Sequence, residues 1–156
     1  MKVLLPLTLG LSLLAAPVFA QTSKNDIVDF GDPKPLSVVT EEATFEFQVE
    51  EAKTLAQQAR GMMFRESMDP ETGMIFEFEE PKIATIWMKN TSIPLDILFV
   101  RSNGKILKIE HSHQPYTLRS ASSEAVIAAV VELKGGEAKR RGIRPGDEVK
   151  HPFFGN

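Results

Sequence analysis

Apolar and polar residues alternate along several short stretches of this chain, and a period of two is typical of a strand with one buried face. In residues 44–50, Phe45, Phe47 and Val49 share one face and polar side chains occupy the other. Residues 83–88 are instead apolar on both faces, which predicts a central strand. The other stretches with strand character are 36–40, 74–78, 96–101, 105–110, 125–133 and 148–151. The pattern therefore predicts about seven or eight short strands.

The period changes to that of a helix in residues 51–60, which have an acidic first turn and Arg60 in the last turn. Gly61 follows as a C-cap. Residues 136–141 have the composition of a single helical turn that ends at Gly142. One short helix and one helical turn are therefore expected beside the strands.

The stretches 96–101 and 105–110 are joined by Ser-Asn-Gly at residues 102–104. Asn-Gly supplies the positive φ angles that a tight turn needs, so these stretches are expected to pair as a β-hairpin. Many short strands with one helix are typical of an α+β domain with a mainly antiparallel β-sheet. Such a sheet protects its edges by curling, and we expect a partial barrel with the helix over one open end or face.

The beginning of the chain differs in composition from the rest. Residues 1–20 combine one cation, Lys2, with an apolar core and small residues that end at Ala20. This order is typical of a secretory signal peptide with cleavage after Ala20. Residues 21–35 are polar and rich in turn formers, which indicates a flexible leader. We expect a single domain over residues 36–156, periplasmic or secreted, without a membrane segment once the signal peptide is removed.

Charge and cysteine content restrict the function classes. The chain has 18 basic and 21 acidic residues, a net charge of −3. Removal of Lys2 with the signal peptide makes the mature protein slightly more acidic. A nucleic-acid partner is therefore not expected, since such proteins carry a basic surface. The absence of cysteine rules out disulfides, a thiol nucleophile and a lipid anchor on cysteine.

A polar segment interrupts two apolar runs within residues 86–100. Lys89, Asn90 and Asp96 need partners there, because buried polar groups without hydrogen bonds are destabilising. In one interpretation Asn90 and Asp96 bind amides of the loop, while Lys89 neutralises Asp96. In the other interpretation the loop presents Lys89 and Asn90 to a carboxylate, phosphate or carbonyl group of a ligand.

Glu132 ends an otherwise apolar face of the last long predicted strand. A carboxylate in that position needs a cation or water, and Arg60, Arg65 and Lys89 are the candidate partners. Alternatively, Glu132 and Asp96 line one cleft. Arg60 and Lys89 would lie in the same cleft, and such a set suits acid–base chemistry or a polar ligand.

Methionine and histidine side chains raise the question of a metal site. Soft methionine sulfur suits Cu(I), but Met is an ordinary filler at the core-facing positions of Met62, Met63, Met74 and Met88. His111 and His113 share one face of a strand, with His151 as a third ligand for Zn(II) or Cu(II). This spacing is weak evidence for a metal site, and His111 and His113 lie at a predicted strand end. We therefore expect no metal and no cofactor.

Several motifs follow one another along the chain. They are RGMMFR at 60–65, GMIF at 73–76, WMKNTSIPLDILFV at 87–100, VELKGG at 131–136 and GIRPGDEV at 142–149. Together they resemble the "domain of unknown function 192" family over residues 36–151. The resemblance implies a small β-rich domain, exported or cytosolic, with no established activity, cofactor or substrate.

Familiar catalytic and nucleotide-binding signatures, such as G-x-S-x-G, H-E-x-x-H and the P-loop, are absent. We therefore favour a non-enzymatic, exported domain that binds a small polar ligand or an envelope protein through its loops. The candidate binding residues are Arg60, Arg65, Lys89, Asn90, Asp96 and Glu132.

Two alternatives remain open. One is an envelope hydrolase or lyase in which a carboxylate acts as general base and a cation stabilises an oxyanion. The candidates are Asp96 or Glu132 for the first role and Lys89 or Arg60 for the second. The other alternative is a structural interaction module without a ligand.

Overall fold

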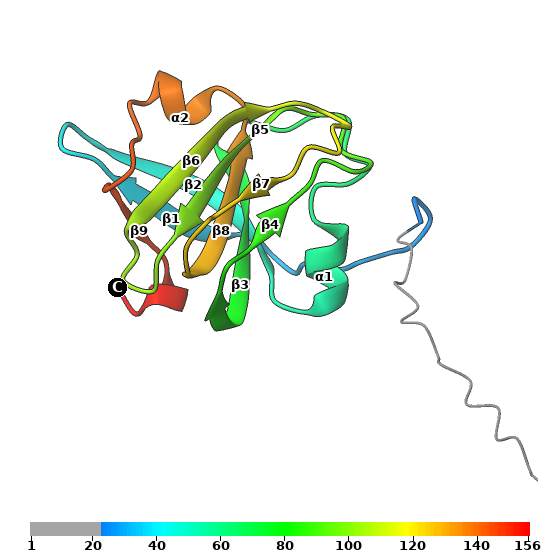
Figure 1. Ribbon diagram of the computed structural model, residues 1–156, viewed down its shortest axis with the longest axis horizontal. Coiled ribbons are helices and arrows are strands. Elements are labelled where there is room, and N and C mark those ends of the chain that lie inside the picture. The colour runs from blue at the N-terminus through cyan, green and yellow to red at the C-terminus, as the bar shows by residue number, and fades with distance from the viewer. Residues whose placement is uncertain (1–22) are drawn as a thin grey trace, which may run out of the picture.

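The computed structural model describes residues 23–156, whose arrangement is shown in Figure 1. The predicted signal peptide, residues 1–20, lies outside them. The strands are β1 (Lys34–Val39), β2 (Thr44–Ala52), β3 (Thr72–Lys82), β4 (Thr85–Ile86), β5 (Leu95–Val100), β6 (Ile106–His113), β7 (Ala121–Ser122), β8 (Ile127–Lys134) and β9 (Glu148–Lys150). The helices are α1 (Leu55–Arg60), α2 (Glu137–Arg140) and the 3-10 turn η1 (Pro152–Phe154). No helix among the described residues is long and apolar enough to cross a membrane.

The domain is mostly β, with a curled main sheet and few short helices (Figure 1). Seven strands form this sheet in the order β6-β5-β8-β3-β2-β1-β9, and β4 pairs with β7 in a separate sheet. Parallel pairing occurs between β2 and β3, with α1 in the crossover between them, so the expected antiparallel sheet is in part mixed. At one end the Val149 N–H donates to the Gly104 carbonyl (2.8 Å). The two edges of the sheet thus approach each other there, in the manner of a partial barrel.

Two apolar clusters cover the two faces of the main sheet, because strand side chains alternate between faces. Val131 of β8 belongs to the first cluster, which includes residues of both edge strands and therefore lies inside the curl. Val130 of β8 belongs to the second cluster on the outer face. There Met62, from the segment after α1, and Ala84, before β4, close over the sheet. The outer cluster is the one that positions the candidate site.

The predicted hairpin is confirmed, since β5 and β6 pair antiparallel and Gly104 has a φ of 76°. The predicted helix begins later than expected. Thr54 caps α1, and its side chain accepts a hydrogen bond from the Gln57 amide within a capping box. Residues up to Ala52 extend β2 instead, so the acidic residue assigned to the first helical turn belongs to a strand.

The predicted central strand at residues 83–88 is wrong. The β3–β8 register shifts between Glu77 and Lys82, and the chain then leaves the main sheet. Only residues 85–86 are in strand conformation, in the small sheet with β7. Ala84 and Met88 are buried, whereas Trp87 is 58% exposed. The apolar side chains of this segment that do not face the core, such as Trp87, therefore lie at the protein surface and not inside the sheet.

Candidate functional site

Glu132 lies in the middle of the main sheet, on its outer face. It pairs with Met74 of β3 on one side and with Ile97 of β5 on the other. Both neighbours belong to the outer apolar cluster, and Glu132 itself is only 4% exposed. The sequence therefore places a carboxyl group inside an apolar layer, where the charged form is strongly disfavoured.

The surroundings of Glu132 hold it in the neutral form. Burial raises the pKa of Glu132 to about 8 from an ordinary value of 4.5, and the nearby Arg65 charge lowers this pKa only in part. Within the part of the chain that the structure describes, the Oε2 atom is buried and has no hydrogen-bond partner. At neutral pH, Glu132 is thus a protonated carboxylic acid with unused hydrogen-bonding capacity.

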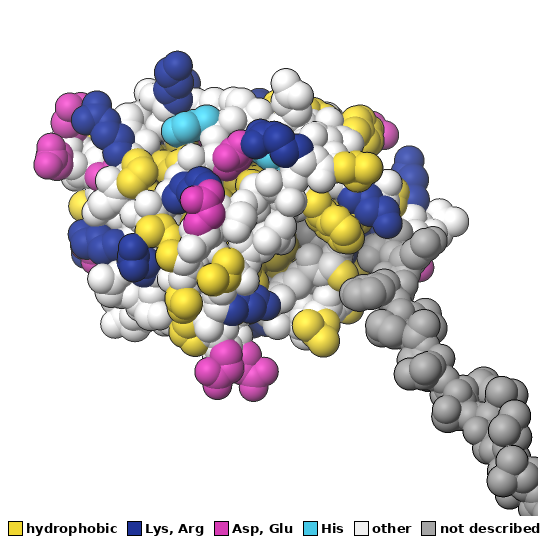
Figure 2. Space-filling view, viewed as in Figure 1, with side chains coloured by type: hydrophobic (Ala, Val, Ile, Leu, Met, Phe, Trp, Pro, Cys, Tyr) yellow, Lys and Arg dark blue, Asp and Glu magenta, His cyan; other side chains and the backbone are white. Residues whose placement is uncertain are grey.

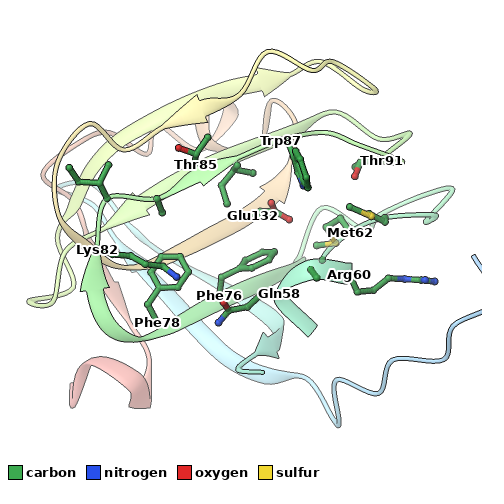
Figure 3. A pocket seen from close by; sticks show the side chains of 16 residues that line it. Gln58, Arg60, Met62, Phe76, Phe78, Lys82, Thr85, Trp87, Thr91 and Glu132 are labelled. Carbon is green, nitrogen blue, oxygen red and sulfur yellow. The ribbon is translucent and has the colours of Figure 1, made fainter. Parts of the chain in front are cut away.

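A pocket of about 430 Å³ opens beside this carboxyl group. Its labelled lining residues in Figure 3 are Gln58, Arg60, Met62, Phe76, Phe78, Lys82, Thr85, Trp87, Thr91 and Glu132. The Glu132 carboxyl group points into the pocket between Trp87 and Phe76, while Arg60 extends away at one side (Figure 3). The pocket therefore has aromatic and thioether walls with a carboxylic acid at its centre.

The mouth of the pocket is apolar and carries basic groups at its margin. Ile83 and Trp87, which line it, are 60% and 58% exposed. The Lys82 Nζ atom lies 4.1 Å from the centre of the Phe78 ring. Figure 2 shows the surface hollowed on the side of β4 and α1, with hydrophobic side chains around the hollow. The mouth of the pocket therefore combines apolar surface with basic groups.

Asp96 lies on the opposite face of the sheet from Glu132, because its pairing partner on β8 is Leu133. Its carboxylate accepts backbone hydrogen bonds from Ser112 (2.8 Å), Gly136 (3.0 Å) and Ala138 (2.7 Å). These bonds tie the end of β6 and the start of α2 to β5. Asp96 therefore has a structural role, as one interpretation of the polar segment proposed.

The expected neutralisation of Asp96 by Lys89 is wrong. Lys89 is exposed, and its Nζ atom lies 5.7 Å from the Trp87 ring centre; no ion pair joins it to Asp96 within residues 23–156. Asn90 has a φ of 55°, and its carbonyl accepts the Phe64 amide (2.8 Å). Asn90 thus fixes the loop against the segment after α1, and Asp96 needs no cation because three amides satisfy it.

Neither of the two arginines forms the expected ion pair with Glu132 in the described part of the chain. Arg60 donates to the Ser23 carbonyl (2.6 Å), and its guanidinium group lies 4.7 Å from the Phe64 ring centre. Arg65 pairs with Glu50. The guanidinium groups of Arg60 and Arg65 are thus held by the Ser23 carbonyl and by Glu50 instead of by Glu132.

Of the six candidate residues, Arg60 and Glu132 line one pocket, and Asp96 lies across the sheet from them. The proposed cleft with two carboxylates is therefore not formed. The sequence analysis missed the aromatic wall of Phe76, Phe78 and Trp87. Alternation in 74–78 placed both phenylalanines on one face, but only the β3–β8 register shows that Glu132 shares this face.

Comparisons with known proteins agree with the fold. The DUF192 family, described as "Uncharacterized ACR", matches residues 37–151. A crystal structure from Sinorhizobium meliloti 1021, described as a "putative transcription regulator", is 34% identical and has a TM-score of 0.78. The match covers 82% of this chain and 99% of that one.

A second crystal structure, of a protein of unknown function from Novosphingobium aromaticivorans DSM 12444, is 40% identical with a TM-score of 0.75. The match covers 76% of this chain and 85% of that one. A search of curated proteins finds no match. The extent of the family match and the two structural similarities agree, and the chain belongs to the DUF192 family.

Proposed function

We propose that this domain binds a small, largely apolar molecule in the pocket beside Glu132, and that the protonated carboxyl group of Glu132 hydrogen-bonds to a polar group of that molecule. The buried Oε2 atom without a partner is the observation that carries this proposal. An unsatisfied buried polar group costs about 1–3 kcal/mol, and a ligand that pairs with it recovers this energy. The pocket volume of about 430 Å³ is suitable for a small ligand.

The chemistry of a neutral carboxylic acid narrows the ligand class. Its hydroxyl group donates and its carbonyl oxygen accepts, so a ligand group with the same two capacities makes two hydrogen bonds. Primary amides, lactams and protonated carboxylic acids have this property. The walls formed by Phe76, Phe78 and Trp87 favour an aromatic or branched aliphatic body. The small polar ligand expected from the sequence is thus replaced by a mainly apolar one with a single polar group.

The two alternatives have less support. A general acid with a pKa of about 8 suits catalysis near neutral pH, which favours an enzyme in one respect. However, Asp96 is turned away from Glu132, and the exposed Lys89 does not line the pocket. A structural module needs no such pocket. The S. meliloti protein is described as a transcription regulator, but a nucleic-acid partner for this chain is not favoured, because its net charge is −3.

We also propose an exported location, which rests on the sequence pattern of residues 1–20. Cell fractionation followed by N-terminal sequencing tests it. The expected result is a periplasmic or secreted protein that begins at Gln21. A cytosolic protein with an intact N-terminus would contradict the proposal.

Ligand binding is tested by a thermal-shift screen of aromatic and branched aliphatic amides, lactams and acids, followed by calorimetry on the hits. Wild-type binding should weaken above pH 8 as Glu132 ionises, because the carboxylate can no longer donate. Glu132→Gln keeps a donor and an acceptor and should bind amides without this pH dependence. Glu132→Leu should lose at least tenfold in affinity. The matched control is Glu79→Gln, which neutralises an exposed carboxylate of β3 outside the pocket.

Two results would contradict the proposal. The first is a hit that binds Glu132→Leu as tightly as it binds the wild-type protein. The second is a pH profile that is the same for the wild type and Glu132→Gln. Trp87→Ala provides a further check, because this half-exposed side chain lines the pocket and its loss should weaken binding with little effect on folding.

A further inference from the structure

A second polar cluster lies on the inner face of the sheet, the face opposite to Glu132. Glu51 of β2 pairs with Ile75, a residue of the inner cluster, and Glu77 follows two positions later on the same face of β3. His151 comes from the other end of the chain, directly before η1, which Figure 1 draws in red near the C-terminus. Three elements distant in sequence thus bring two carboxylates and an imidazole together.

The distances within this cluster are short. The Nε2 atom of His151 lies 3.6 Å from Oε1 of Glu51, and the Nδ1 atom lies 3.8 Å from Oε1 of Glu77. One ligand atom from each of the three residues lies within 4.8 Å of the other two. The His151 side chain is fully buried, and the two glutamate side chains are 16% and 12% exposed. The cluster is therefore partly enclosed rather than a chance meeting of surface side chains.

His151 provides an independent sign of a ligand. Its Nδ1 atom accepts a hydrogen bond from the Phe153 amide (3.3 Å), which caps η1. Its Nε2 atom is buried and, among the described residues, has no hydrogen-bond partner. This orphan nitrogen faces Glu51 at a distance too long for a hydrogen bond. A buried polar atom of this kind, aimed at two carboxylates, indicates a group that the protein itself does not supply.

Lys53 is the cation that the chain places nearby. Its Nζ atom lies 3.0 Å from Glu51 and 3.9 Å from Glu77, and the side chain is 54% exposed. Lys53 therefore satisfies the outer oxygen of Glu51 but leaves the imidazole nitrogen without a partner. An exposed lysine can move into solvent at little cost when a stronger cation enters.

We propose that Glu51, Glu77 and His151 form a binding site for a divalent transition-metal ion such as Zn(II). An imidazole nitrogen with two carboxylate oxygens is a donor set that Zn(II) accepts, with about 2.0–2.2 Å to each donor. Mg(II) and Ca(II) prefer sites made of oxygen alone. Coordination through Nε2 would move the ring proton to Nδ1, where it can be donated towards Glu77. The hydrogen bond of 3.3 Å from the Phe153 amide to Nδ1 would then be lost.

The site differs from the metal set considered in the sequence analysis. His111 is half-exposed at the edge strand β6, lies 3.9 Å from Asp96 and does not belong to the cluster of Glu51, Glu77 and His151. Bound metal would join β2, β3 and the C-terminal turn, so it would stabilise the fold and anchor η1. Three protein donors leave the fourth coordination position of Zn(II) for a water molecule, as in catalytic zinc sites. The same three residues could therefore hold a structural or a catalytic ion.

Calorimetry of Zn(II) with the purified, metal-free protein tests this proposal, and the absorption bands of Co(II) report the number and kind of donors. The expected result is one ion per chain with micromolar or tighter affinity, a raised Tm, and no saturable binding of Mg(II). His151→Asn keeps an acceptor for the Phe153 amide and removes the ring nitrogen, so Zn(II) affinity should fall at least tenfold while the fold persists. Glu77→Gln should weaken binding similarly.

Two further variants sharpen the result. Lys53→Gln removes the competing cation from an exposed position and should tighten Zn(II) binding. His111→Asn removes an exposed imidazole outside the cluster and should leave Zn(II) binding unchanged. The proposal is overturned if the wild-type protein shows no saturable binding of one ion, or if His111→Asn abolishes binding while His151→Asn retains it. If His151→Asn fails to fold, the test rests on Lys53→Gln and Glu77→Gln. The proposal is also overturned if these two variants and the wild-type protein bind Zn(II) with equal affinity.

Discussion

Replacement of Glu132 by glutamine should make the protein more stable than the wild type at alkaline pH. The folded protein holds this carboxyl group protonated up to a pKa of about 8, whereas the unfolded chain releases the proton near 4.5. Between these values the unfolded state binds fewer protons, so the stability contributed by Glu132 is full below pH 4.5 and is lost as the pH rises to 8. Glutamine has nearly the same shape and does not titrate.

The size of the effect follows from the two pKa values. One pKa unit corresponds to about 1.4 kcal/mol, so the rise from 4.5 to about 8 is worth at most about 5 kcal/mol. Between pH 5 and pH 8, the unfolding free energy of Glu132→Gln relative to wild type should grow by about 4 kcal/mol. Above about pH 9 the difference should stay constant, because Glu132 is then ionised in both the folded and the unfolded wild-type protein.

Urea unfolding of the wild type and the variant at pH 5, 7 and 9 measures this difference, and the contributions of all other titrating groups cancel when the two proteins are compared. Glu79→Gln, which changes an exposed carboxylate on β3, should show a difference close to zero at each pH. A pH-independent difference for Glu132→Gln would refute the reasoning. A wild type that gains stability over the variant as pH rises would show that Glu132 is an ion-paired carboxylate.

Two structural predictions concern the opposite face of the sheet. Asp96→Asn replaces one acceptor oxygen by a donor group and leaves at least one of the three amides without its acceptor, so urea unfolding should show a loss of about 3 kcal/mol. Unchanged stability would disprove the structural role. Gly135→Ala places a Cβ atom 2.9 Å from the backbone of Pro94 and should cost about 2 kcal/mol by the same assay. Gly142→Ala, where the added atom meets open space at a φ of 68°, should cost about 1 kcal/mol, and equal losses at both positions would exclude the steric explanation.

Features that depend on local chemistry were predictable from the sequence. The hairpin of β5 and β6 needs only two strand patterns and a turn with glycine, and all three lie within nineteen consecutive residues, 95–113. The parallel pairing of β2 with β3 was not predictable in the same way. It depends on how α1 crosses between them, and a hydrophobic pattern does not specify the direction of a neighbouring strand.

The candidate site was only partly predictable because its geometry rests on long-range register. Glu132 was recognised as an anomaly in an apolar stripe, which is a local observation. That Glu132 faces Met74 and the neighbouring Phe76, while Asp96 faces the other way, depends on the pairing of β8 with β3 and β5. A central strand at residues 83–88 would bury Trp87, but the chain leaves the main sheet before this residue, which is therefore exposed.

The contrast between the two buried acidic residues of the main sheet, Asp96 and Glu132, supports the proposed role of Glu132. Asp96 has an evident structural reason to be acidic, since three backbone amides require an acceptor at that point. Glu132 has none, because its neighbours on β3 and β5 are apolar and its Oε2 atom has no partner within residues 23–156. A leucine would fill the same space without a desolvation cost. Glu132 opposes the local packing and opens into a pocket, and we therefore propose that a ligand, rather than the fold, accounts for this side chain.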